Sequence, residues 1–201
     1  RSEPLGRITQ FEYDSNGNQI AEVDALGRRR TVEYDALNRV ARRIDALHNT
    51  TSVEYDAVGN VSREVDARLS ATVHTYDKLN RRKTTRDARD FVTEFGYDKV
   101  GNLVEEKRAN GNVVSNVYDA LNRLKTVTDS LSPVMGPVAQ FDYDLDGNQT
   151  LSVDANGNST VMVYDELSQL REQRLPLART LKMSYDLVGN KISDTDARDN
   201  T

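Results

Sequence analysis

Acidic side chains are the groups in this sequence that could carry out chemistry. The chain has 201 residues, of which 32 are Asp or Glu, and two carboxylates held side by side can serve as a general acid and a general base. It has no cysteine and only two histidines, His48 and His74, with no nucleophile pattern around either. We therefore predict that the protein is not an enzyme, and we expect no catalytic site and no cofactor.

Calcium binding is the second chemistry that these oxygen-rich segments suggest. The segments DSNGN at 14–18, DLDGN at 144–148 and DANGN at 154–158 place oxygen ligands at alternate positions. A calcium loop of the EF-hand type has Gly at its sixth position and Glu at its twelfth, whereas Gly is fourth here. A backbone turn explains the segments better, and Asp144, Asp146 and Asp154 stay the calcium candidates.

The elements that hold these carboxylates follow from an internal repeat, which settles the architecture before any local feature does. Every tyrosine is followed by Asp, and successive tyrosines lie 21 residues apart except for one step of 25. The nine pairs are Tyr13 with Asp14, Tyr34 with Asp35, Tyr55 with Asp56, Tyr76 with Asp77, Tyr97 with Asp98, Tyr118 with Asp119, Tyr143 with Asp144, Tyr164 with Asp165 and Tyr185 with Asp186. We interpret them as structural residues of the repeat.

A second marker falls eleven residues after the tyrosine and is usually Asp followed by Ala. It occurs as Asp24, Asp45, Asp66, Asp87, Asp129, Asp154 and Asp196, with Arg108 and Leu175 as exceptions. Residues 3–6 lie in phase with 24–27, and residues 196–201 correspond to the same turn. We therefore expect residues 1–201 to be a single array, cut at both ends from a longer protein.

Each unit has the pattern of a β-hairpin. An apolar residue stands two places before most tyrosines, as in Val32 and Val53, and a charged residue such as Glu33 or Glu54 stands between. This alternation predicts a strand with one apolar and one wet face. The four additional residues of the long step fall within 129–140, where Pro133 and Pro137 predict a protruding loop.

The residues after each tyrosine predict a turn. A type I turn favours Asp first, and in hairpins the residue after it commonly takes a left-handed conformation, which Gly and Asn tolerate best. The left-handed position holds Gly17, Asn38, Gly59, Asn80, Gly101, Asn122, Gly147, Ser168 and Gly189. Gly and Asn alternate, with Ser168 as the one departure, so the sequence predicts a repeat of two hairpins.

The predicted fold class is all-β: an antiparallel meander of about nine 21-residue hairpins, about eighteen strands in all, with no helix. Twist accumulates in so long a sheet, so we expect it to curl or spiral. Its open edges invite pairing with another chain. The isolated chain is therefore expected to associate edge to edge.

Composition excludes several partners. The hydrophobic fraction of 37% is low for a deep core, and the formal net charge is only −5. Mixed charges of this kind give no strong field for nucleic acid, and no apolar run is long enough to span a membrane. We interpret basic clusters such as Arg28, Arg29 and Arg30 as solvated strand faces.

The sequence resembles the YD-repeat or RHS-repeat family. The similarity rests on YDAVGNV at 55–61, YDALNRV at 34–40, YDKVGNL at 97–103 and YDALNRL at 118–124, and it covers the whole chain. Proteins of this kind include bacterial RHS proteins, shell components of insecticidal toxin complexes and the animal teneurins. The resemblance implies that the hairpins form a strip that spirals into a hollow shell, which in toxin members encloses a C-terminal effector.

Two functions follow as expectations. The first is a structural segment of a secreted or cell-surface shell, whose partners are the remainder of that shell and the domain that it encloses or displays. Nothing in the sequence matches the self-cleaving aspartyl domain of toxin members. The alternative is a cell-surface repeat that binds carbohydrate or mediates adhesion, with tyrosines stacking on sugars, although tyrosines beside apolar residues are more often packing units.

Overall fold

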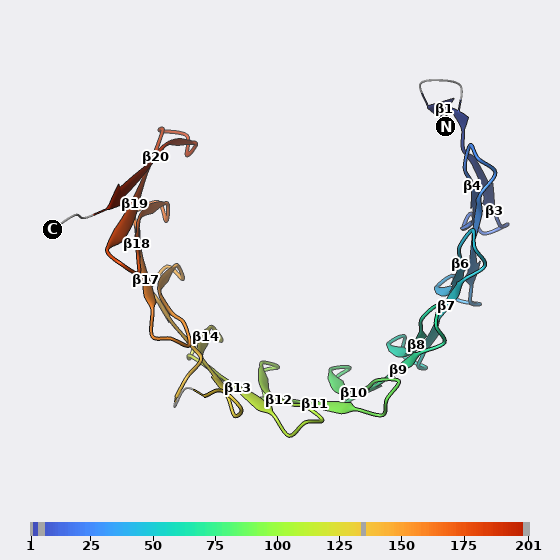
Figure 1. Ribbon diagram of the computed structural model, residues 1–201, viewed down its shortest axis with the longest axis horizontal. Coiled ribbons are helices and arrows are strands. Elements are labelled where there is room, and N and C mark those ends of the chain that lie inside the picture. The colour runs from blue at the N-terminus through green and yellow to red at the C-terminus, as the bar shows by residue number, and fades with distance from the viewer. Residues whose placement is uncertain (1, 4–6, 134–135, 199–201) are drawn as a thin grey trace. The chain divides into compact units, whose positions relative to one another are not determined.

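The computed structural model describes residues 2–3, 7–133 and 136–198 (Figure 1). Within these ranges the regular structure consists of antiparallel β-strands without a helix, so the predicted meander of hairpin repeats is confirmed. No described segment forms a helix long and apolar enough to cross a membrane. The chain divides into two compact units, Arg1–Glu94 and Phe95–Thr201, and β11 (Val92–Tyr97) contains the boundary.

The first unit begins with a two-stranded piece, β1 (Ser2–Glu3) and β2 (Arg7–Ile8). Eight strands then pair in chain order and lead into β11. They are β3 (Gln10–Tyr13), β4 (Gln19–Val23), β5 (Arg29–Tyr34), β6 (Val40–Ile44), β7 (Thr50–Tyr55), β8 (Val61–Val65), β9 (Ala71–Tyr76) and β10 (Arg82–Arg86).

The second unit continues the same pattern. Its strands after β11 are β12 (Leu103–Lys107), β13 (Val113–Tyr118), β14 (Leu124–Asp129), β15 (Ala139–Tyr143), β16 (Gln149–Val153), β17 (Ser159–Tyr164), β18 (Leu170–Leu175), β19 (Arg179–Tyr185) and β20 (Lys191–Arg198). The long step of the sequence is the connection between β14 and β15, as expected. Residues 134 and 135 of that predicted loop lie outside the described residues.

The strand register shifts by one residue beside eight of the nine tyrosines. In the pair of β5 and β6, Glu33 lies opposite Arg42 and Tyr34 lies opposite Val40, so Ala41 has no counterpart. The same shift recurs in the β7–β8 and β17–β18 pairs. This is the bulge that a type I turn with a left-handed fourth residue requires to restore the twist of the strands.

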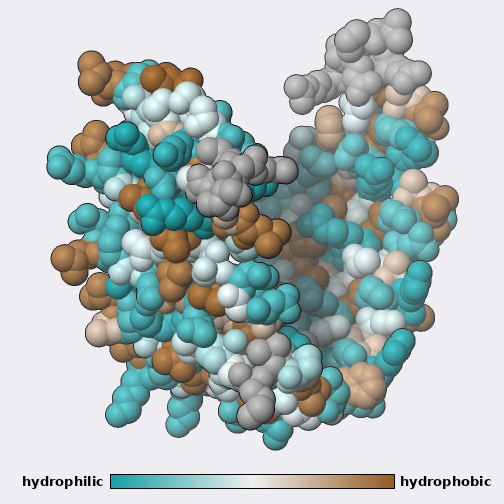
Figure 2. Space-filling model, turned by 60° about the vertical axis from the view of Figure 1, so that its left-hand side comes forward, coloured by the Kyte–Doolittle hydropathy of each residue, from teal (hydrophilic) through white to brown (hydrophobic). Residues whose placement is uncertain are grey.

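Apolar burial is shallow throughout the described residues. Ala21, 1% exposed, is the only hydrophobic residue among them that counts as buried. The apolar residues two places before each tyrosine are half-buried at most, and Phe11 is 38% exposed. Figure 2 shows apolar side chains scattered among polar ones on the visible surface. Stability must therefore come largely from strand pairing and from contacts between turns.

One predicted turn is wrong. Asp196 was expected to start the turn after the last return strand, but it lies inside β20 and pairs with Leu181 on β19. The pairing of β19 with β20 extends to Arg179 and Arg198, and the Arg179 guanidinium contacts the Asp196 carboxylate at 2.9 Å. Residues 4–6 and 199–201, which the phase argument also used, lie outside the described residues.

Candidate functional site

The repeated Asp of each first turn, the turn that follows a tyrosine, holds the backbone of that turn. In the turn after β5, the Asn38 N–H donates to the Asp35 carbonyl at 3.0 Å, and the Asp35 N–H donates to the Arg39 carbonyl at 2.8 Å. The Asp35 Oδ1 accepts the N–H groups of Leu37 and Arg39, both at 2.9 Å. All nine first turns repeat the two backbone bonds. The carboxylate is therefore occupied by its own turn.

The fourth residue of each first turn is left-handed, whichever residue type fills the position. The φ angle is 59° at Asn38, 101° at Gly59 and 58° at Ser168. Positive φ is also found at the other members of the series, Gly17, Asn80, Gly101, Asn122, Gly147 and Gly189. One backbone conformation thus accounts for Gly, Asn and Ser at this position.

The fifth residue of the first turn has a role that sequence reasoning missed. Except at Gln169, its side chain donates to the second oxygen of the turn Asp: Asn60 Nδ2 to Asp56 Oδ2 at 3.0 Å, and Arg39 Nε to Asp35 Oδ2 at 2.8 Å. The same contact is made by Asn18, Arg81, Asn102, Arg123, Asn148 and Asn190. The sequence did contain a signal for this role: in the first turns a left-handed Gly is always followed by Asn, and a left-handed Asn is always followed by Arg.

These donors stabilise the ionised carboxylate. The side-chain amide of Asn60, opposed by partial desolvation and helped by the backbone amides, holds the pKa of Asp56 below its ordinary value. At Asp35 the backbone N–H of Arg39 lowers the pKa most, and its guanidinium adds to the effect. An Asp held in this way is a poor proton donor near neutral pH.

Side chains also join successive first turns. The contact differs between Gly-Asn turns and Asn-Arg turns, which are named by their fourth and fifth residues. Where a Gly-Asn turn precedes an Asn-Arg turn, the Asn of the first donates to the left-handed Asn of the second. Asn18 Nδ2 reaches Asn38 Oδ1 at 2.8 Å, and Asn60 Nδ2 reaches Asn80 Oδ1 at 3.2 Å. The contact recurs between Asn102 and Asn122 and between Asn148 and the Ser168 hydroxyl, both at 3.0 Å.

Where an Asn-Arg turn precedes a Gly-Asn turn, the arginine makes the contact instead. The Arg39 guanidinium lies 4.1 Å from the centre of the Tyr55 ring, and a Cβ added at Gly59 would come within 3.5 Å of Arg39. Arg123 lies 4.6 Å from the Tyr143 ring and donates to the Asp144 carbonyl at 2.9 Å. At Gly59 that distance is an ordinary van der Waals contact, and a Cβ added at Gly147 would meet no atom within 4 Å, so the arginines do not exclude a side chain there.

The alternation of Gly and Asn coincides with an alternation of contacts between turns. Asn in the left-handed position accepts from the turn before it, whereas the turns after Arg39 and Arg123 carry Gly in that position and a tyrosine that the arginine contacts. These two contacts alternate along what we name the turn ladder, defined as the first turns joined by these side chains. They recur with the two-hairpin period that the sequence indicated.

The tyrosine hydroxyls also link neighbouring hairpins, apart from the contacts between turns. Seven of the tyrosine hydroxyls donate to the first backbone carbonyl of the preceding return strand, as from Tyr76 to Val61 at 2.8 Å. The same bond is made by Tyr34, Tyr55, Tyr118, Tyr143, Tyr164 and Tyr185, at 2.9 to 3.1 Å. Burial raises the pKa of Tyr164, and the charge of Asp144 adds to it. Tyr13 is the exposed member of the series, at 58%.

The calcium candidates do not come together. Asp144 precedes β16 and Asp154 follows it, so the two lie in turns at opposite ends of one strand. The Asp144 carboxylate accepts from Asp146 N at 3.0 Å, Asn148 N at 2.8 Å and Asn148 Nδ2 at 3.0 Å. No group of three His, Cys, Asp or Glu among the described residues is placed to hold a metal ion.

The two histidines belong to different hairpins. His48 occupies the left-handed position of the turn after β6, with φ 65°. His74 lies on β9, is 6% exposed, and its Nδ1 is 3.0 Å from the Thr85 hydroxyl. Glu64 lies 3.5 Å from the His74 Nε2. Both histidines thus lie outside the first turns that form the turn ladder.

The hairpins and the turn ladder define a class of protein: an antiparallel β-repeat protein whose recurring side chains bind the next hairpin. The sequence matches the teneurin YD-shell family over residues 4–200, and the chain belongs to that family. The resemblance to YD-repeat proteins drawn from the sequence is thereby confirmed.

Solved structures share the fold. The crystal structure of TcdB2-TccC3-Cdc42 is similar with a TM-score of 0.61 at 19% identity, over 96% of this chain and 12% of that chain. The crystal structure of TcdB2-TccC3 is similar with a TM-score of 0.58 at 15% identity, over 100% of this chain and 15% of that chain. This chain thus spans a small part of each of them. No curated protein matches the sequence.

Proposed function

We propose that this chain is a wall segment of a YD-repeat shell that, in the whole protein, encloses or displays another domain, such as a toxin or effector. Membership of the YD-shell family supports a structural role. The turn ladder is the observation that carries the proposal. Its Asn and Arg side chains, together with the tyrosine hydroxyls, hold one hairpin to the next: Asn60 donates to Asn80, and Tyr76 donates to the Val61 carbonyl.

The proposal includes partners and location. The partners are the remaining hairpins of the same shell and the enclosed domain, and the wall is a sheet that curls around that domain. The location is outside the cell or at its surface, as in the toxin-complex shells and teneurins that the sequence resembles. Separated from the rest of a shell, the chain is expected to associate through strand edges, which light scattering against concentration would test.

Limited proteolysis of the natural polypeptide that contains these hairpins tests enclosure. The domain that accompanies the repeats should resist protease in the whole protein and be cleaved much faster when expressed by itself. Weakening the wall with several Tyr-to-Phe changes should restore cleavage in the whole protein. Equal cleavage rates of the free and accompanied domain would contradict enclosure.

No observation favours the carbohydrate-binding alternative. The hydroxyl of Tyr55 is bonded to the Val40 carbonyl, and a guanidinium covers one face of its ring. Tyr143 is placed in the same way against Leu124 and Arg123. Saturable binding of this chain on a glycan array would nevertheless overturn the structural role as its sole function.

A further inference from the structure

His74 occupies a position of the repeat that is usually apolar. It lies on β9, two residues before Tyr76, where the neighbouring hairpins have Val53 and Phe95. Strand β9 pairs with β8 on one side and with β10 on the other (Figure 1). His74 is 6% exposed, and a polar ring buried to this extent needs partners for both of its nitrogens.

One of the two ring nitrogens lacks a partner. Nδ1 is 3.0 Å from the hydroxyl of Thr85, which lies opposite His74 in the strand register. Nε2 is the one buried side-chain nitrogen or oxygen in the described part of the chain that makes no hydrogen bond. Asn116, the other polar residue at this repeat position, donates its amide to the Leu103 carbonyl at 2.9 Å. The His74 Nε2 is therefore free to bind a ligand.

A carboxylate faces this nitrogen. Glu64 lies opposite Thr72, two residues before His74, so Glu64 and His74 are diagonal neighbours on one face of the sheet. The Glu64 Oε2 is 3.5 Å from the His74 Nε2, which is longer than ordinary N–H···O hydrogen bonds. A nitrogen and an oxygen bound to one tetrahedral zinc ion are separated by about 3.4 Å. The observed separation fits an ion that both atoms share.

The nearest arginines along the strands do not compete for this carboxylate. Arg63 and Arg86 both lie opposite Val73, so they are on the other face of the sheet. On that face Arg63 pairs with Glu54 at 2.7 Å. The Glu64 side chain is 55% exposed, so it can move aside and admit an ion to the buried ring nitrogen.

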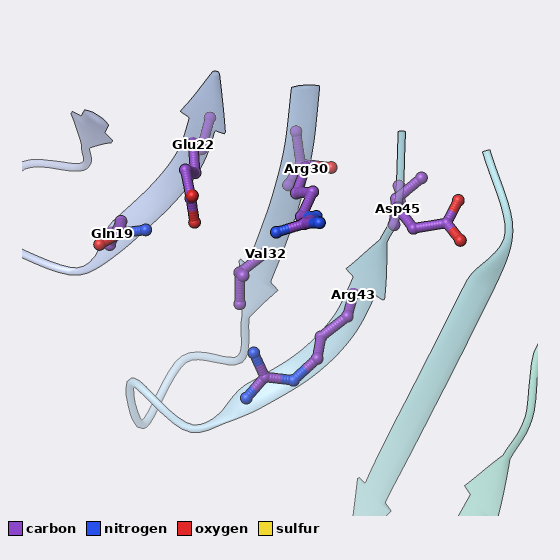
Figure 3. Close-up of a pocket in the computed structure, with 9 residues that line it drawn as sticks. Gln19, Glu22, Arg30, Val32, Arg43 and Asp45 are labelled. Atoms are coloured by element: carbon purple, nitrogen blue, oxygen red, sulfur yellow. The ribbon is translucent and has the colours of Figure 1, made fainter. Parts of the chain in front are cut away.

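A hollow beside β4, β5 and β6 does not gather its lining in the same way (Figure 3). Ala21 and Ile44 both lie opposite Thr31. Arg43 lies opposite Val32, the next residue of the strand. Successive residues of a strand point to opposite faces, so the apolar residues and the arginine belong to different faces. The residues around the unpartnered ring nitrogen, by contrast, share one face.

We propose that His74 and Glu64 bind a zinc ion through Nε2 and the carboxylate, with water in the remaining positions. Imidazole nitrogen and carboxylate oxygen are both zinc ligands. Thr85 is a positioning residue: its hydroxyl accepts the Nδ1 hydrogen, which leaves the lone pair on Nε2 for the metal. Two protein ligands are fewer than the three or four of most zinc sites, so the ion should exchange readily. The inference does not depend on the shell function.

Zinc chloride is the probe, and magnesium chloride is the matched control, because Mg²⁺ prefers oxygen ligands. The isotope-labelled 201-residue protein has two histidines, so the ring resonances of His48 and His74 can be followed separately during titration. Zinc should shift the His74 ring resonances with saturation, and magnesium should leave them unchanged. Saturating zinc should also raise the midpoint of thermal unfolding, because the ion binds the folded state.

Three substitutions locate the site, with the backbone amide shifts of β8, β9 and β10 as the measure of binding. His74→Phe, which introduces the residue type found at position 95, should abolish the zinc-dependent shifts. Glu64→Gln keeps the size of an exposed side chain and should weaken zinc binding at least tenfold. Thr85→Val should weaken it about tenfold, as expected when a ligating histidine loses its positioning partner.

Two further substitutions are matched controls. His48→Asn removes the other imidazole, and Asn tolerates the left-handed conformation of that position. Glu54→Gln removes a carboxylate that pairs with Arg63 on the other face of the sheet. Both changes should leave zinc binding unchanged.

Three outcomes would overturn the proposal. Zinc-dependent shifts that persist in His74→Phe would place the ion elsewhere. Equal weakening by Glu64→Gln and Glu54→Gln would show a general charge effect in place of a site. If zinc leaves the His74 ring resonances of the unsubstituted protein unchanged, Nε2 binds no metal.

Discussion

Left-handed residues with a side chain are the positions where this chain bears local strain. In the turn after β8, Leu69 has φ 64° and its side chain is 81% exposed, while its N–H donates to the Asp66 carbonyl at 2.9 Å. The left-handed conformation costs a residue with a Cβ roughly 1–2 kcal/mol. Nothing around an exposed Leu69 compensates for that cost through burial.

Leu69→Gly should therefore stabilise the protein. The gain in the free energy of unfolding should be about 0.5–1 kcal/mol, because glycine relieves the left-handed strain but loses more chain entropy on folding. Urea denaturation measures it. Leu79→Gly is the control: Leu79 is similarly exposed, at 69%, but does not have a positive φ. A gain at both positions, or at neither, would contradict the explanation.

The sequence alone explained the residue types at the turns only through the backbone conformation that each position needs. Asp first and Gly or Asn fourth follow from turn stereochemistry, and Asp56 and Gly59 are placed accordingly. The contacts that accompany their alternation could not be read, because they join side chains of different hairpins about 20 residues apart, as Asn60 and Asn80 are. The separation of the calcium candidates Asp144 and Asp154 could not be read either, because the two are close in sequence but lie in turns at opposite ends of β16.

At the scale of the element, hairpins are held together by tyrosine hydroxyls as well as by strand pairing. Tyr76→Phe removes the donor to the Val61 carbonyl and should lower the free energy of unfolding by about 1 kcal/mol, the usual net value of such a bond. Tyr13→Phe is the matched control, because Tyr13 is exposed and no hydrogen bond of its hydroxyl is found among the described residues. Equal effects of the two changes in urea denaturation would show that the bond to Val61 contributes nothing.

The hairpins themselves could be predicted because the alternation of apolar and charged residues and the turn residues agree in most units. The position of Asp196 inside a strand could not be predicted. Its sequence marks a turn, yet β19 offers further partners and the pairing continues through Leu181 and Arg179. A strand end is set by the strand beside it as well as by its own residues, so local turn propensity yields where a partner strand extends further.

At the scale of the whole molecule, the turn carboxylates make stability depend on pH. The pKa is lowered at Asp14, Asp24, Asp35, Asp45, Asp56, Asp77, Asp98, Asp119, Asp144, Asp154 and Asp186. A lowered pKa means that the unfolded chain binds protons before the folded protein does. The stabilisation is present above the ordinary Asp pKa near 3.8 and is lost as pH falls through the lower folded values.

The free energy of unfolding should accordingly be steady at pH 6 and fall progressively below about pH 4. Urea denaturation at a series of pH values measures it. Replacing Asp35 and Asp77 by Asn should make the decline shallower, since fewer carboxylates then titrate, whereas Tyr76→Phe should shift the whole curve without changing its slope. An unchanged stability between pH 6 and pH 3 would mean that the turn hydrogen bonds do not favour the ionised carboxylates.

The turn ladder finally makes the two-hairpin repeat a property of the whole chain that deletion can test. In a protein whose units contact mainly their neighbours, stability is close to a sum of unit and interface contributions.

Deleting residues 40–60 joins two Asn-Arg turns, so Arg39 meets Asn80 where it had met Gly59, and Asn80 loses its donor Asn60. Deleting residues 40–81 places Arg39 before the Gly101 turn and restores the alternation. In the longer deletion Arg82 is also replaced by Val, so that Val follows Arg39 in both proteins, as Val61 does in the shorter one.

The longer deletion should then have a free energy of unfolding at least equal to that of the shorter one, although it lacks one more hairpin. If the longer deletion is clearly less stable, strand count outweighs the turn ladder, and the alternation of Gly and Asn does not set the unit of the repeat.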